Sequence, residues 1–116
     1  MIKYENNDGC ISISHKVIAD LVGHAVSDCY GVAGMSYRNK TQGLVMLLNK
    51  KSYNRGVKVT AHKDGLIIDL HIVVTMGVNI KAISQSVVDR VSYTVQDITG
   101  MNIKEVNVFI DSMKLD

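Results

Sequence analysis

Hydrophobic and polar residues alternate along some stretches of the chain and recur at helical spacing along others. Alternation predicts a short strand over residues 10–13, two strands on either side of Asp64-Gly65, and a last strand over residues 103–111. Apolar residues three or four positions apart predict helices over about residues 15–29 and 80–99. Ser14 and Gly100 are residue types that commonly begin and end helices. The predicted order is therefore β-α-β-β-α-β, and whether residues 31–35 add another strand stays open.

The two central strands predict a β-hairpin. A type I′ turn centred on Asp64-Gly65 would pair Lys63 with Leu66. Counted outward from that turn, both strands place their apolar side chains on one face and their polar side chains on the other, and a slip of one residue would destroy the match. The hairpin therefore has one buried face and one outer face.

These elements predict an α+β fold with two layers, in which the two main helices cover one face of a small, mainly antiparallel sheet. With 116 residues the chain is expected to form one domain over residues 10–112, with a basic excursion at residues 36–55. Residues 1–9 are expected to be a flexible N-terminal lead. The other face of the sheet would be open unless a partner covers it.

Composition is that of an ordinary globular protein, with 47% hydrophobic and 21% charged residues. No stretch reaches the roughly 20 apolar residues that span a bilayer. The polar first residues do not resemble a signal peptide. We therefore expect a cytoplasmic protein, whose only two cysteines, Cys10 and Cys29, are reduced and act as small apolar side chains.

The net charge of +2 is unevenly distributed. Residues 29–63 contain seven basic residues and no acidic one, whereas the remainder carries 6 basic and all 11 acidic residues, a balance of −5. This asymmetry bears on partners more than on the fold. The candidate basic patch consists of Arg38, Lys40, Lys50, Lys51 and Arg55. Basic residues interleaved with tyrosines suggest, as an alternative function, a nucleic-acid-binding module that uses residues 38–63.

No catalytic, cofactor-binding or metal-binding constellation is evident, so we expect neither an enzyme nor a cofactor. His62 and His71 share the outer face of the hairpin, but the predicted register separates them by about 13 Å, too far for one zinc ion. The chain has no Gly-x-Ser-x-Gly elbow around a serine and no phosphate-binding loop of the Walker type.

Five short segments in the same order resemble the alkaline shock protein family of Gram-positive bacteria, over about residues 9–110. They are Gly31-Val32-Ala33-Gly34-Met35-Ser36, Gly56-Val57-Lys58-Val59, Ile68-Asp69-Leu70-His71-Ile72-Val73-Val74, Gly77-Val78-Asn79-Ile80, and Thr99-Gly100-Met101 with Val106-Asn107-Val108. The chain departs from the family's usual pattern at Lys81, where a proline is common, and in its basic middle segment.

The resemblance implies a non-enzymatic protein of cell-envelope stress response or homeostasis. It also implies a self-associating scaffold or adaptor, without a membrane span of its own, that a separate anchor protein holds at the membrane. Protein contacts would then use the outer face of the sheet. The candidate interaction surface consists of Lys58, Thr60, His62, Ile67, Asp69, His71, Val73 and Phe109.

Overall fold

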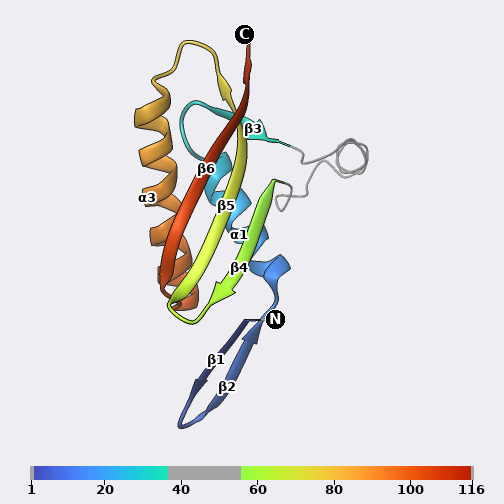
Figure 1. Cartoon of the computed structure of the whole chain (residues 1–116), viewed down its shortest axis with the longest axis vertical. Coiled ribbons are helices and arrows are strands. Elements are labelled where there is room, and N and C mark those ends of the chain that lie inside the picture. Colours follow the sequence, from blue (N-terminus) through green and yellow to red (C-terminus); the bar gives the residue numbers. More distant parts are fainter. Residues whose placement is uncertain (1, 37–55, 116) are drawn as a thin grey trace.

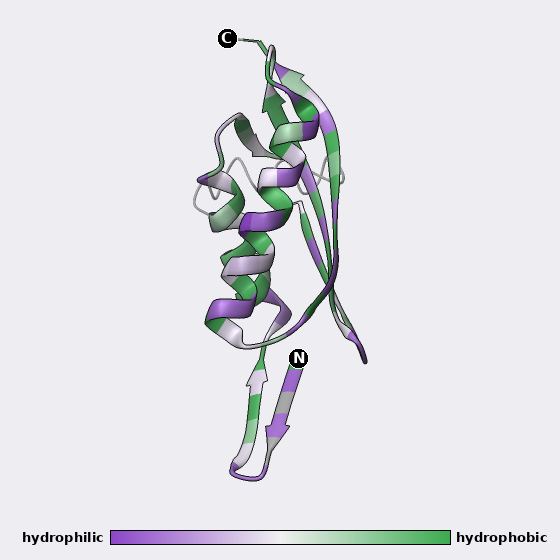
Figure 2. Cartoon of the chain, turned by 90° about the vertical axis from the view of Figure 1, so that its left-hand side faces the viewer, coloured by the Kyte–Doolittle hydropathy of each residue, from purple (hydrophilic) through white to green (hydrophobic). Residues whose placement is uncertain are grey.

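The computed structural model describes residues 2–36 and 56–115. Two helices lie side by side on one face of a four-stranded sheet (Figures 1 and 2), which confirms the predicted two-layer α+β fold. The elements in chain order are β1 (Ile2–Asn6), β2 (Gly9–Ile13), α1 (His15–Ser27), β3 (Val32–Met35), β4 (Val57–His62), β5 (Gly65–Thr75), α3 (Ile80–Thr99) and β6 (Ile103–Lys114). The predicted order of elements lacked β1, and β3 answers the open question of whether residues 31–35 add a strand.

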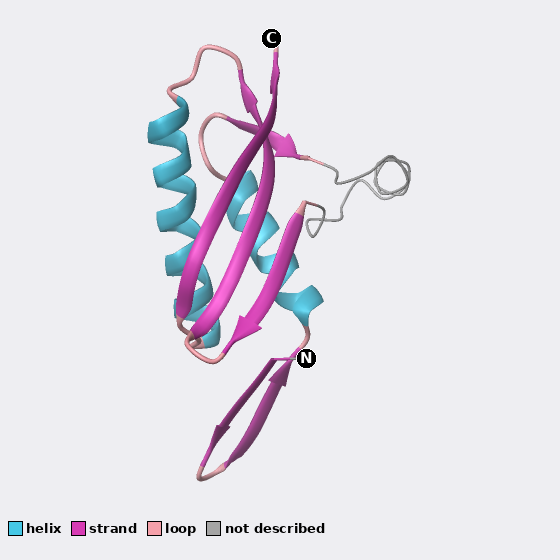
Figure 3. Ribbon diagram, in the orientation of Figure 1, coloured by secondary structure: helices cyan, strands magenta, loops and turns pink. Residues whose placement is uncertain are grey.

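Strand β5 is the centre of the sheet. Strand β6 runs parallel to it along one edge, and β4 and β3 share its other edge as antiparallel neighbours (Figure 3). The parallel pairing of β5 with β6 follows from the crossover through α3, since a strand that returns through a helix lies parallel to the strand it left. The sheet is thus mixed, with antiparallel pairing on one side of β5 only.

The β4–β5 hairpin forms as predicted, but its register differs by two residues. His62 pairs with Gly65, so Lys63 and Asp64 make the turn, and Val57 lies opposite Leu70. The predicted type I′ turn was wrong, because no described residue other than glycine has a positive φ and such a turn needs two. A shift of two keeps every side chain on its predicted face, since strand side chains alternate with period two.

Gly65 explains this register. It lies at the start of β5 with φ +142°, and a Cβ atom there would come within 2.9 Å of the Asn102 carbonyl oxygen and 3.0 Å of the Lys104 nitrogen. The glycine is therefore needed where β5 meets the start of β6, rather than inside the turn. The new register also places His62 and His71 further apart than predicted. His62 pairs with Gly65, and His71 lies six residues further along β5, which corresponds to a separation of about 20 Å.

Both helices begin at side-chain caps. The Ser14 hydroxyl accepts a hydrogen bond from the Val17 N–H at 3.2 Å, and the side-chain oxygen Oδ1 of Asn79 accepts one from the Ala82 N–H at 3.1 Å. Helix α3 ends at Gly100 in the left-handed conformation, as predicted. Gly31 does not cap α1, which ends at Ser27; its missing Cβ leaves room for the Ile83 side chain of α3.

The core lies between the helices and the sheet. Its fully buried side chains come from α1, β5 and α3: Ile18, Val22, Val26, Ile68, Leu70, Ile72, Val74, Val87, Val91 and Val95. Ile80 and Ile98 fit the helical period of the buried residues of α3, but they are exposed because they occupy its terminal turns. No helix in the described part of the chain is both long enough and apolar enough to cross a bilayer.

The N-terminal residues form a second, two-stranded sheet. Strands β1 and β2 pair as a hairpin that extends beyond one end of the domain (Figure 1). We expected residues 1–9 to be a flexible lead, and this expectation missed β1. Ile2 is only 6% exposed and joins the hydrophobic core, so burial of one apolar side chain ties the hairpin to the domain.

Candidate interaction face

The sheet has one face toward the helices and one open face. Along β5 the even-numbered side chains from Leu66 to Val74 are buried, and the odd-numbered ones from Gly65 to Thr75 are half-buried. Strand period two therefore separates a core face from an open face. Among the described residues, no helix or strand packs over the open face (Figure 2).

All eight residues of the candidate interaction surface lie on this open face. Across the β4–β5 ladder, Lys58 lies opposite Asp69 and Thr60 opposite Ile67, and His62 lies opposite Gly65. Across the β5–β6 ladder, His71 lies opposite Phe109. Residues that face each other across a ladder share one face of the sheet. The predicted basic patch, Arg38, Lys40, Lys50, Lys51 and Arg55, lies outside the described residues.

An ordered cluster occupies the centre of the open face. Nδ1 of His71 lies 3.0 Å from a carboxylate oxygen of Asp111, and its ring stacks on Phe109 with centroids 4.7 Å apart and planes 14° apart. Beside it, the Asn107 amide donates a 2.8 Å hydrogen bond to the Asp69 carboxylate. The stacking holds Phe109 in place while 46% of the residue remains exposed.

Two members of this cluster, Asn107 and Asp111, were not among the predicted interaction residues. Their partners are 38 and 40 positions away in the sequence, and contact depends on the parallel pairing of β6 with β5. Asp111 reaches His71 from a register shift, where Ile72 pairs with Ile110 and Val73 with Ser112. The strand–helix–strand spacing around α3 is the signal that could have indicated parallel pairing.

The described part of the chain offers no cluster of three or more histidine, cysteine or acidic side chains that could hold a metal ion. The His71–Asp111 pair alone provides at most two ligands. Its arrangement instead orients the imidazole, because a carboxylate bonded to Nδ1 leaves Nε2 directed away from that carboxylate. This geometry presents the oriented imidazole of His71, which can form a hydrogen bond, beside the exposed aromatic side chain of Phe109.

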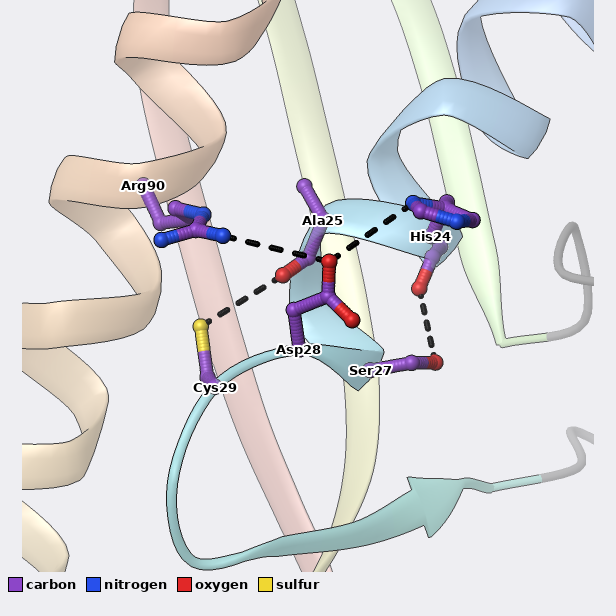
Figure 4. Close-up of polar contacts among 7 residues, drawn as sticks. His24, Ala25, Ser27, Asp28, Cys29 and Arg90 are labelled. Carbon is purple, nitrogen blue, oxygen red and sulfur yellow. Dashed lines mark hydrogen bonds and ion pairs between the residues drawn. The ribbon is translucent and has the colours of Figure 1, made fainter.

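A second polar cluster joins the end of α1 to α3 (Figure 4). Asp28 lies 3.8 Å from both His24 and Arg90, and the Cys29 thiol donates a 3.5 Å hydrogen bond to the Ala25 carbonyl oxygen. Burial raises the pKa of the Cys29 thiol, the Arg90 cation opposes this, and the Asp28 carboxylate adds to it. Cys29 is therefore held as a neutral thiol, the form that suits packing rather than nucleophilic chemistry.

This shift predicts a pH dependence of stability. The folded-state pKa of Cys29 lies above its unfolded value of about 8.5, so the contribution of this group is fully present below that pH and is lost as the pH rises through the folded-state pKa. Denaturant titrations between about pH 7 and pH 10 should show that Cys29→Ala loses less unfolding free energy with rising pH than the wild type. Cys10→Ala, at an exposed position on β2, is the matched control and should follow the wild type. Parallel curves for all three proteins would contradict the assignment.

Solved structures with the same fold include two variants titled MamM CTD. One aligns with a TM-score of 0.52 and 14% identity over 85% of this chain and 99% of that chain. The other aligns with a TM-score of 0.52 and 13% identity over 87% of this chain and 100% of that chain. At this level of identity the likeness concerns the fold alone.

Sequence relatives cover nearly the whole chain. Uncharacterized protein YloU of Bacillus subtilis is 34% identical over 98% of this chain and 96% of its own length. Uncharacterized protein YqhY of the same organism is 34% identical over 100% of this chain and 87% of its own length. An uncharacterized protein of Streptococcus pyogenes is 30% identical over 98% of this chain and 95% of its own length.

A family model also matches residues 3–115, and it is that of the alkaline shock protein 23 family, described as having a cell envelope-related function. The match extends beyond the predicted residues 9–110 at both ends and confirms the resemblance seen in the sequence. The chain belongs to the alkaline shock protein 23 family and shares its cell envelope-related function.

Proposed function

We propose that this protein is a non-enzymatic scaffold of the cell envelope that binds other proteins, including further copies of itself, through the open face of its sheet. It would work on the cytoplasmic side of the membrane, where a separate anchor protein would hold it. The observation that carries the proposal is the ordered cluster of Phe109, His71 and Asp111 on a face that no described element covers.

Binding surfaces gain most from rigid aromatic side chains, because little conformational entropy remains to be lost on contact. Phe109 is such a side chain: its ring is already stacked, and 46% of the residue is exposed. Ile67 and Val73 add apolar area, while Lys58, Asp69 and Asp111 supply the charged surroundings typical of protein interfaces. The alternative function, nucleic-acid binding, depends on cations that are mostly outside the described residues, and no contact described here favours it.

Light scattering during size-exclusion chromatography tests self-association. We expect assemblies larger than the monomer at low ionic strength, near 0.01 M, and smaller species near 1 M, where the screening length falls from about 30 Å to about 3 Å. Phe109→Gln should reduce assembly at low salt. Tyr93→Gln removes a more accessible aromatic side chain from α3, where Tyr93 is 70% exposed, and should leave assembly unchanged. A monomer at every concentration and ionic strength would contradict self-association.

A crosslinking pull-down from native cells tests the wider scaffold role. Variants of the open face, such as Phe109→Gln with Val73→Thr, should lose partners that the wild type captures, and an anchor protein with a membrane span should be among them. A variant with neutral residues at Lys50 and Lys51 provides the comparison for the basic stretch. If the open-face variants still capture the same partners and the Lys50/Lys51 variant does not, the binding surface does not lie on the open face of the sheet.

A further inference from the structure

An apolar groove lies where the N-terminal hairpin meets the two helices. It is bordered by β2, the first half of α1 and the last turn of α3, and its volume is about 560 Å³. Its aliphatic lining consists of Ile11, Ile13, Val17, Leu21 and Ile98. Ile11, Val17 and Ile98 are each between 54% and 63% exposed. Single exposed apolar residues are ordinary, whereas a contiguous group that lines a groove marks a contact site.

The charged and ionisable residues that line this groove have partners within the same copy. Asp20 lies 4.0 Å from Lys16, and His24 lies 3.8 Å from Asp28. An occupant of the groove therefore need not supply a charge, and an apolar occupant would not have to displace either pair. The groove thus suits aliphatic side chains better than a charged ligand.

The opposite end of the domain presents exposed apolar side chains. Met113 and Leu115 flank Lys114 in the sequence, and the Lys114 carbonyl oxygen accepts a 2.9 Å hydrogen bond from the Met76 N–H, so these residues lie together. Met76, Met113 and Leu115 are each between 42% and 69% exposed, and we call these three residues the apolar end. Methionine side chains are unbranched and flexible, so they adapt to grooves of irregular shape.

The apolar end of one copy lies far from the groove of the same copy. The end of β6 is at one end of the longest axis, which extends 52 Å, and the β1–β2 hairpin is at the other (Figure 1). Helix α3 spans the distance between them: it begins at Ile80, four residues after Met76, and reaches the groove at Ile98, about 27 Å further along the helix. The two apolar surfaces can therefore meet between copies but not within one.

We propose that the apolar end of one copy docks in the groove of the next, so that copies join end to end. The occupant of the groove is a second copy of this chain, because each copy carries exposed aliphatic side chains at the end opposite its groove, and their burial stabilises the contact. A contact between two different surfaces repeats, so it builds an open chain or a ring. The contact rests on the proposed self-association and lies apart from the open face, which stays accessible to other partners.

Two complementary variants test this contact near 1 M sodium chloride, where exposed charges are screened beyond about 3 Å. One lacks apolar side chains of the apolar end (Met113→Gln with Leu115→Gln), and the other lacks those of the groove (Val17→Gln with Ile98→Gln). In light scattering, each variant alone should need a concentration on the order of tenfold higher than the wild type to assemble, since two aliphatic side chains lose their burial. An equimolar mixture should form a one-to-one heterodimer, because each variant supplies the surface that the other lacks. The heterodimer would also show that both variants are folded.

Tyr93→Gln, at an exposed position on α3, is the control and should assemble like the wild type. Wild-type assembly by both the end variant and the groove variant, or a mixture that stays monomeric, would overturn the end-to-end contact. If Phe109→Gln abolished assembly while those two variants assembled normally, the open-face function would stand and the end-to-end contact would fail. Assembly that is lost in the two variants and kept in Phe109→Gln would support the end-to-end contact against self-association through the open face. A monomeric wild type would overturn both.

Discussion

Replacing Gly56 with alanine is expected to lower the free energy of unfolding by roughly 3 kcal/mol. Gly56 has φ +77°, a conformation that L side chains rarely adopt, and an added Cβ would come within 2.5 Å of the Ser36 carbonyl oxygen and 2.8 Å of the His71 carbonyl oxygen. The His71 carbonyl accepts a hydrogen bond from the Ser36 N–H, and the His71 N–H donates one to the Gly56 carbonyl, so β5 pairs here with the segments that flank residues 37–55. Relief of the contact would therefore break hydrogen bonds at the edge of the central strand.

Gly100→Ala separates the steric contribution from the conformational one. Gly100 has φ +75°, almost the same as Gly56, but nothing lies within 4 Å of its missing Cβ. Its replacement should cost about 1 kcal/mol, the ordinary penalty for a non-glycine residue in this conformation. Urea titrations followed by circular dichroism measure both variants. Equal losses of unfolding free energy for the two variants would contradict the predicted steric penalty, because they would show that the backbone near Gly56 shifts at little cost.

Leu70→Ala is expected to lose about 2–5 kcal/mol of stability. Leu70 is fully buried at the middle of β5, opposite Val57 on one side and Val108 on the other, and it belongs to the cluster that packs beneath the helices. The substitution removes apolar contacts from the one described strand that pairs with β3, β4 and β6 alike. The resulting cavity cannot collapse without disturbing three strand pairings.

Ile67→Ala is the matched control, since it lies on the same strand and faces away from the helices. Ile67 is half-buried on the open face, so its truncation should cost about 1 kcal/mol. The same urea titrations apply. If Ile67→Ala lost more unfolding free energy than Leu70→Ala, the open face would be the better-packed one, which would contradict the two-layer arrangement. Light scattering on Ile67→Ala also tests the proposed interface, where a reduction in assembly is expected.

The helices and the faces of the strands could be predicted because they depend on local information. Ser14, Asn79 and Gly100 mark helix ends through backbone hydrogen bonds and conformational preference. The eight residues of the candidate interaction surface were placed on the correct face although the hairpin register was wrong by two, since period-two alternation is unchanged by an even shift. Local pattern thus identified the open face without the exact pairing.

Other features could not be predicted from local pattern. Strand β1 alternates over only four residues, Ile2-Lys3-Tyr4-Glu5, and its burial at Ile2 arises only when the hairpin meets the domain. Gly65 signals a turn by composition, but its missing Cβ serves the approach of β6, nearly 40 residues later in the chain. Ile80 and Ile98 fit the helical period of α3, yet they are exposed because the packing partners of α3 do not cover its ends.

By itself, the sequence determined the α+β class, the two helices with their caps, the family and the separation of each strand into a core face and an open face. Those features follow from residue period and capping chemistry, which act over a few positions. Only the tertiary structure decided that β6 runs parallel to β5, and with it the contacts of His71 with Asp111 and Phe109 and of Asp69 with Asn107. Such contacts join residues that only the packing of α3 across the sheet brings together, because strand pairing is set by tertiary packing and not by local preference.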